Sequence, residues 1–206
     1  MSARSSTRQL PLFPLQAVLF PGGLLSLKVF ESRYLDLVSQ CLREQQPFGV
    51  VALRQGAEAG RSAESVSFEF TGVMAELIDV DAPQTGILQV RCRGAQRFEV
   101  RETKQDADGL WQATVRLLPD DETVLPTDGL VETVRGLANA IGTLKQQGSE
   151  PFLKPFHFDN AGWVSNRWCE ILPISVAAKQ KLMELQDPLV RLQLVADFLR
   201  SKGVVS

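Results

Sequence analysis

The spacing of apolar residues changes once along this 206-residue chain, near Pro119, and that change constrains the fold more than any other feature. Before Pro119, apolar and polar residues mostly alternate, which is typical of half-buried strands. After it, apolar residues recur every three or four positions, which is typical of helices. The pattern therefore predicts an α+β protein, with a β-rich part at 8–119 and an α-helical part at 124–203.

The β-rich part holds six or seven predicted strands and one inserted helix. The helix is expected between Glu31 and Gln45, where apolar residues follow helical spacing. Strands are expected at 10–20, 24–30, 48–53, 66–78, 88–93, 98–101 and 111–117, with a polar loop at 55–64. Short strands with turns of this kind are typical of a compact barrel or sandwich.

The segment Leu10–Tyr34 is apolar enough to resemble a membrane or secretion signal. Three prolines and the Gly22-Gly23 pair interrupt it, so it lacks the unbroken apolar run that either signal needs. Prolines suit an edge or interrupted strand, and Pro21-Gly22-Gly23 predicts a turn. We therefore expect no membrane segment. The three widely spaced cysteines suit a reducing cytoplasm rather than a disulfide framework.

Four helices are expected after the acidic stretch that follows Pro119. They are predicted at 126–147, from a cap at Asp159 to Leu172, from a cap at Ser175 to Leu185, and from Asp187 to Gly203. The beginning of the fourth helix is the most clearly marked, because Asp187 can cap the helix and Pro188 fits its first position. Short connections between such helices predict a small bundle.

Catalytic machinery is not expected. His157 is the only histidine, and its place between Phe156 and Phe158 indicates a structural role. The nucleotide-binding P-loop pattern and paired cysteines for zinc are both missing, so we expect neither cofactor nor metal. Ser175 and Lys179 are four residues apart, and a Ser–Lys pair can perform acyl transfer. Ser175 is placed to cap a helix and Lys179 to face solvent, so both are predicted to be structural, and a hydrolase ranks third among the candidate functions.

Four arginines are predicted to share one face of the strands at 88–93 and 98–101, opposite the apolar face. They are Arg91, Arg93, Arg97 and Arg101. Such a face is either a solvated surface that discourages aggregation or a shallow basic patch for RNA or acidic peptide. The net charge of −2 and the lack of interleaved exposed aromatics argue against nucleic acid, so RNA binding is the alternative function.

Several motifs together resemble the N-terminal substrate-binding domain of the ATP-dependent Lon proteases, and especially the stand-alone bacterial proteins made of that domain. The first is LPLFPL at Leu10–Leu15, followed by the proline-glycine turn, FESRY at Phe30–Tyr34 and FGVV. GAQRF at Gly94–Phe98 comes next, and LPIS and KQKLMEL lie in the helical part. The resemblance covers roughly residues 8 to 200, and the combination is specific although each motif alone is weak.

The resemblance implies a PUA-like β pseudo-barrel with an inserted helix, followed by a C-terminal helical bundle. It implies a non-enzymatic module that recognises unfolded or extended polypeptide segments, or another protein, without the ATPase and peptidase parts of the proteases. The binding surface is expected in a groove between barrel and helices, or at an exposed barrel edge that accepts an extended strand. The candidate polypeptide-binding residues are Phe13, Phe30, Tyr34 and Phe68.

Overall fold

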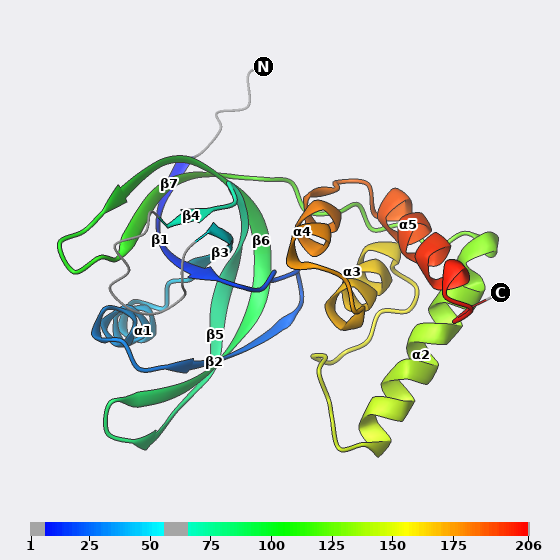
Figure 1. Ribbon diagram of the computed structural model, residues 1–206, viewed down its shortest axis with the longest axis horizontal. Coiled ribbons are helices and arrows are strands. Elements are labelled where there is room, and N and C mark those ends of the chain that lie inside the picture. Colours follow the sequence, from blue (N-terminus) through cyan, green and yellow to red (C-terminus); the bar gives the residue numbers. More distant parts are fainter. Residues whose placement is uncertain (1–6, 56–65, 206) are drawn as a thin grey trace. The chain divides into compact units, whose positions relative to one another are not determined.

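The computed structural model describes residues 7–55 and 66–205, which form two compact units, one ending at Pro119 and one beginning at Asp120 (Figure 1). The first unit contains β1 (Thr7–Leu15), β2 (Leu24–Val29), α1 (Ser32–Glu44), β3 (Phe48–Gln55), β4 (Ser67–Phe68), β5 (Thr71–Gln84), β6 (Ile87–Gln105) and β7 (Trp111–Leu117). The second contains the 3₁₀ helix η1 (Asp128–Leu130) and the helices α2 (Val131–Gln146), α3 (Ala161–Ile171), α4 (Val176–Glu184) and α5 (Pro188–Ser201). The predicted α+β class is confirmed. Nearly all of the predicted loop at 55–64 lies outside the described residues.

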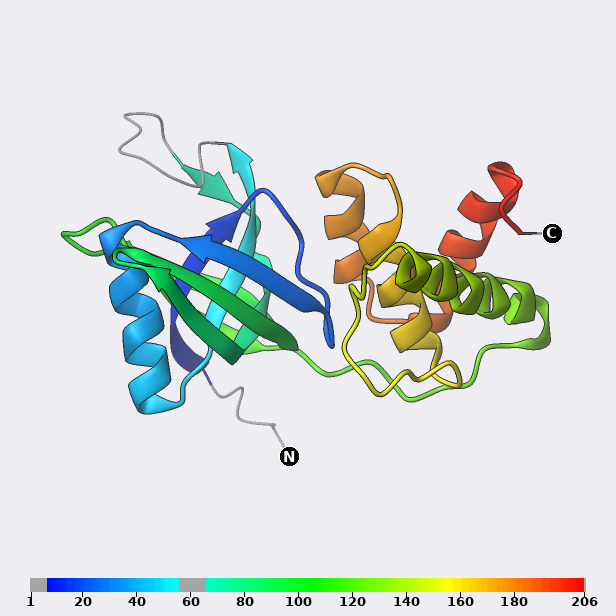
Figure 2. The same cartoon turned by 90° about the horizontal axis from the view of Figure 1, so that it is seen from below.

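The sheet of the first unit closes into a barrel because β1 pairs with β7 and also with β3. The β1–β3 pairing is parallel, and the other strand pairs of the described residues are antiparallel. Figure 2 shows α1 beside the barrel strands from a second direction. Apolar side chains fill the interior, namely Leu10, Leu12, Val51, Phe68, Met74, Phe98, Val100, Ala113 and Val115.

The prolines of β1 are tolerated because each half of this strand pairs on one side only. Residues up to Leu12 pair with β7, and residues from Leu12 onward pair with β3. Pro11 and Pro14 therefore each have an unpaired side, where a missing N–H costs no ladder bond. The expectation of an edge or interrupted strand holds for each half, although β1 as a whole closes the barrel.

Gly94 lies inside one continuous strand, whereas the sequence predicts two strands on either side of it. A Cβ at Gly94 would lie 2.2 Å from the carbonyl oxygen of Phe20, so glycine permits a close approach of two backbones. Gly22, at φ 73°, turns the facing chain and donates to the Gly94 oxygen at 2.8 Å, while the Gly94 N–H donates to Gly23 at 2.8 Å. Gly22 and Gly23 therefore both lie opposite Gly94, which makes a one-residue bulge. The bulge lies where the predicted Pro21–Gly23 turn leads into β2.

Helix α3 is central to the second unit, where it packs against α2, α4 and α5. Its cap is Asn160, whose side-chain oxygen accepts from Trp163 N–H at 3.0 Å, so the predicted cap at Asp159 is wrong by one residue. The caps predicted at Ser175 and Asp187 are confirmed. Within the described ranges, no helix has both the length and the apolar character that a bilayer crossing requires.

Candidate functional site

A pocket of about 270 Å³ lies beside β2, between the end of β1 and the first turn of α1, and we call it the β2 groove. It is lined by Phe13, Leu15, Ser26, Leu27, Lys28, Val29, Phe30, Glu31 and Tyr34. The groove thus brings together three of the four predicted aromatic residues: Phe13 lies on β1, Phe30 directly follows β2, and Tyr34 lies on α1. No other described pocket is lined by as many of the predicted site residues.

Two buried aromatic rings form the floor of the β2 groove. Phe13 and Tyr34 stack face to face, with ring centroids 3.9 Å apart and planes 7° from parallel. The guanidinium of Arg33 lies 4.9 Å from the Tyr34 centroid, which adds a cation–π contact. Phe30 differs from both, because 56% of it is exposed. The groove therefore combines a fixed apolar floor with one aromatic side chain available at its rim.

The groove runs along the edge of β2 rather than over one of its faces. Successive side chains of a strand point to opposite faces, so a pocket over one face would touch every second residue. This pocket is lined by every residue from Ser26 to Glu31. Within residues 7–55 and 66–205, β2 pairs with β6 alone, and its other edge has no partner strand.

The hydrogen-bond pattern of β2 shows which backbone groups face that open edge. The Gly94 N–H bonds to the Gly23 oxygen, so residue 23 belongs to a hydrogen-bonded pair. Hydrogen-bonded and open pairs alternate along an antiparallel ladder, so the odd-numbered residues of β2 bond to β6. The N–H and C=O groups of Ser26 and Lys28 consequently point away from β6, into the open edge.

Of the two charged residues that line the groove, Glu31 is in an ion pair and Lys28 is not. Glu31 and Arg33 form an ion pair at 2.9 Å, and Arg33 also donates to the Gly109 oxygen at 3.2 Å. Lys28 is exposed and, in the described part of the chain, takes part in no ion pair. The lining of the β2 groove therefore carries one uncompensated positive charge. The sequence signal for this residue was that Lys28 is the only charge in its strand.

Phe68 is not part of the β2 groove. It lies in the barrel core, where its ring meets the Trp111 ring edge to face with centroids 5.4 Å apart. The sequence pattern places Phe68 on the apolar face of a strand, but it does not distinguish a core position from a binding position.

The basic face predicted from four arginines does not form as expected. Arg97 is only 3% exposed and donates to the Pro119 oxygen at 3.5 Å, so its predicted place on an exposed face is wrong. The end of β7 and the residues that follow it cover Arg97, since the Leu118 N–H donates to the Arg97 carbonyl oxygen. The other three arginines have acidic neighbours: Arg93 pairs with Glu76 at 2.6 Å, Arg101 pairs with Glu99 at 3.0 Å, and Arg91 lies opposite Asp79.

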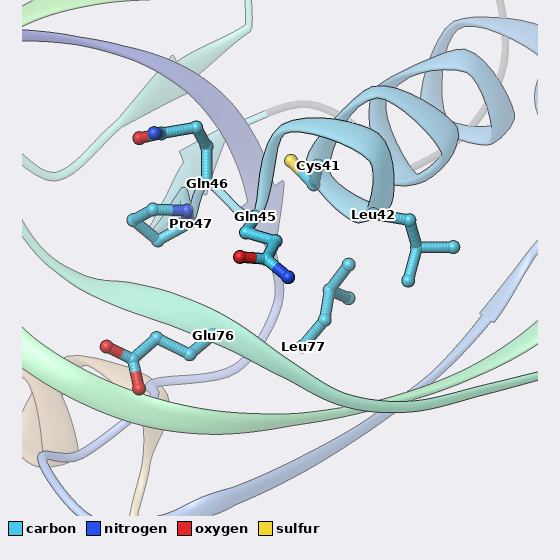
Figure 3. A pocket seen from close by; sticks show the side chains of 7 residues that line it. All are labelled: Cys41, Leu42, Gln45, Gln46, Pro47, Glu76 and Leu77. Atoms are coloured by element: carbon cyan, nitrogen blue, oxygen red, sulfur yellow. The ribbon is translucent and has the colours of Figure 1, made fainter.

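A second pocket, of about 420 Å³, lies where α1 ends beside β5 (Figure 3). It is lined by Cys41, Leu42, Gln45, Gln46, Pro47, Glu76 and Leu77, none of which is among the predicted site residues. Gln46 accepts a hydrogen bond from Arg8, and Glu76 is paired with Arg93. Burial raises the pKa of the Cys41 thiol to about 11, so it is protonated near neutral pH. Two of the polar side chains that line this pocket, Gln46 and Glu76, are thus already engaged with other residues of the protein.

The residues considered for catalysis are engaged in structural contacts. The Ser175 hydroxyl accepts from Ala178 N–H at 3.1 Å, as a helix cap. Lys179 is half-buried rather than solvent-facing as predicted, and its ammonium donates to the Glu170 carbonyl oxygen at 2.9 Å. His157 is exposed, with its ring 6.2 Å from that of Trp163. Across the described residues, no group of His, Cys, Asp and Glu is arranged to hold a metal ion.

Known proteins share both the sequence pattern and the fold. The family model of the ATP-dependent protease La (LON) substrate-binding domain matches residues 9–201. A crystal structure of a Lon N-terminal domain protein from Xanthomonas campestris superposes with a TM-score of 0.74 and 31% identity, covering 92% of this chain and 98% of that one.

Two curated relatives extend the comparison. Lon protease of Paraburkholderia phytofirmans is 28% identical over 204 residues, which are 95% of this chain and 25% of that protein. Protein cereblon of Xenopus tropicalis is 31% identical over 128 residues, which are 59% of this chain and 26% of that protein. The chain thus spans about a quarter of the length of the curated relatives it matches. With its family model matched over residues 9–201, the chain belongs to the family of LON substrate-binding domains.

Proposed function

We propose that this protein is a non-enzymatic module that recognises polypeptide, and that the β2 groove is its binding site. The observation that carries the proposal is that the unpaired edge of β2 lies next to the apolar floor of the groove. The edge of β2 offers unpaired backbone groups, and the stacked rings of Phe13 and Tyr34 lie directly beside it. A polypeptide supplies both complementary features, backbone hydrogen bonds and apolar side chains.

The size of the groove favours part of a chain over a small metabolite. Pockets that enclose drug-sized ligands usually hold about 300–1,000 Å³. The β2 groove, at about 270 Å³, is at the small end of that range and is open along a strand. It suits one or two side chains of a longer ligand whose remainder lies outside. Membership of a family named for substrate binding supports the same class of ligand.

A binding role without catalysis fits the chemistry of the described residues. Burial raises the pKa of the Cys92 and Cys169 thiols to about 12, which keeps them from acting as thiolate nucleophiles. Ser175 and Lys179 are held in the structural hydrogen bonds described above. The three free thiols also suit a cytoplasmic location. Nucleic acid is disfavoured because Arg97 is buried and the neighbouring arginines have acidic partners.

The proposal is tested by binding of a fluorescently labelled, reduced and carboxymethylated model protein that stays unfolded. Phe30→Ala should raise the Kd about tenfold, because it removes the exposed aromatic ring at the rim of the groove. Phe70→Ala is the matched control, since Phe70 is 57% exposed but does not line the β2 groove. Failure of the wild-type protein to bind at tens of micromolar, or equal effects of the two substitutions, would overturn the proposal.

A further inference from the structure

The open edge of β2 has the length and backbone geometry of a template for another strand. β2 contains six residues, and strands of about five or six residues are the commonest in proteins. Its outward N–H and C=O groups, at Ser26 and Lys28 among others, are spaced to bond with a second extended chain. A ligand that pairs with this edge is therefore extended.

The apolar floor defines which side chains such a strand presents. A strand directs every second side chain to the same face. One set of side chains on the added strand would enter the groove over the buried aromatic rings of Phe13 and Tyr34. The other set would face solvent on the side of exposed Ser26 and Lys28. The fitting sequence therefore alternates apolar and polar residues.

The uncompensated charge of Lys28 adds a polar requirement. Lys28 lines the groove and has no ion-pair partner among the described residues, whereas Glu31 already forms an ion pair with Arg33. Oppositely charged residues across paired strands stabilise the pairing, and like charges weaken it. A carboxylate opposite Lys28 is thus favoured on the incoming strand, and a basic residue there is disfavoured.

From these observations we infer that the β2 edge binds an extended polypeptide as an added β-strand, with alternating apolar residues and one acidic residue opposite Lys28. This inference rests on the proposed function and specifies how the same groove engages its ligand. It makes backbone hydrogen bonds, and not only burial of apolar side chains, the source of affinity. Folded helical segments with the same apolar residues are then poor ligands.

A synthetic peptide with alternating Val and Thr and one central Glu is the probe. In the protein, Lys28→Pro removes an outward N–H while leaving the bonds to β6 in place, a change that edge strands tolerate. It should weaken binding about tenfold more than Lys28→Ala, which removes the charge but keeps the N–H. Lys28→Glu should reverse the preference, so that a central Lys in the peptide binds better than a central Glu.

Modified peptides keep the test decisive if Lys28→Pro does not fold. N-methylation of alternate amides should abolish binding to the wild-type protein in one register and leave it intact in the other. Equal binding of both N-methylated peptides, or unchanged binding by a folded Lys28→Pro variant, would refute strand addition. If either result is obtained and Phe30→Ala still weakens binding of the unfolded model protein, the groove still recognises polypeptide. Only the strand-addition mode is then wrong.

Self-association is the competing use of an open edge. If Lys28→Pro converts a dimer to a monomer in sedimentation measurements while peptide affinity does not change, the edge pairs with a second copy of the chain and the inference is overturned. A monomeric wild-type protein whose peptide affinity falls in Lys28→Pro supports it.

Discussion

Arg191 and Asp121 form a two-pronged ion pair inside the helical unit, with N–O distances of 2.7 Å and 3.1 Å. The Arg191 side chain is fully buried, and it also donates to the Leu182 oxygen at 3.0 Å and to Asn166 Oδ1 at 2.8 Å. One guanidinium therefore ties the segment that precedes η1 to α3 and to the end of α4. Buried charges are tolerated only when they are paired and hydrogen-bonded in this way.

Asp121→Ala should lower the free energy of unfolding by about 3–5 kcal/mol, because it leaves the buried Arg191 guanidinium without its carboxylate. Urea unfolding followed by tryptophan fluorescence measures this change, since Trp163 and Trp168 both lie in the same unit. Glu132→Ala is the control: it breaks an exposed Glu132–Arg135 pair of 2.8 Å and should cost less than about 1 kcal/mol. Similar losses in the two variants would contradict a special role for the buried pair.

Gly94→Ala should destabilise the barrel by about 1–3 kcal/mol, because its Cβ would collide with the Phe20 backbone at 2.2 Å. Gly142→Ala offers the opposite case. Gly142 lies inside α2 with open space around the added Cβ, so alanine should stabilise the helix by about 0.5–1 kcal/mol. Chemical denaturation monitored by circular dichroism should give opposite signs for the two substitutions. A neutral Gly94→Ala would mean that the two backbones can separate without cost.

The sequence predicted the α+β class, the strand and helix order and the family because these depend on local spacing and on motifs. The alternation at 111–117 and the Asp187-Pro188 helix start are read within a few residues, and both are found. The sequence does not predict the continuity of β6 through Gly94, because that continuity depends on pairing with β5 on both sides of the glycine. Glycine in a strand pattern indicates a break or a close approach, and local pattern does not decide between them.

The candidate site was predicted only in part, because local motifs identify residues but not the non-local contacts that bring them together. Phe13, Phe30 and Tyr34 were named through the family motifs, yet their meeting in one pocket depends on how β1, β2 and α1 pack. Arg97 was misplaced because alternation assigns a strand face but not what covers that face. Here the segment around Leu118 and Pro119 returns over it, a non-local contact that periodicity cannot reveal.

Glu170 gives the helical unit a pH dependence whose sign can be derived. Its carboxylate accepts from the Arg167 guanidinium at 2.7 Å, and the Arg167 side chain is fully buried. Burial raises the Glu170 pKa from 4.5 to about 7, even though the nearby charges of Arg167 and Lys179 lower it. The folded state therefore keeps a proton that the unfolded state releases near pH 4.5. The stabilising contribution is complete below that pH and is lost as the pH rises toward 7.

Glu170→Gln should flatten this dependence, because glutamine cannot ionise. Between about pH 5 and about pH 8, the wild-type protein should lose about 1–3 kcal/mol more stability than the variant, with the difference levelling off above the raised pKa. Urea unfolding at a series of pH values, followed by fluorescence of Trp163 and Trp168, measures both curves. Parallel curves for the two proteins would show that Glu170 ionises at the same pH in the folded and unfolded states. A wild-type curve that rises over this interval relative to the variant would reverse the sign, and would mean that the Arg167 charge outweighs burial at this carboxylate.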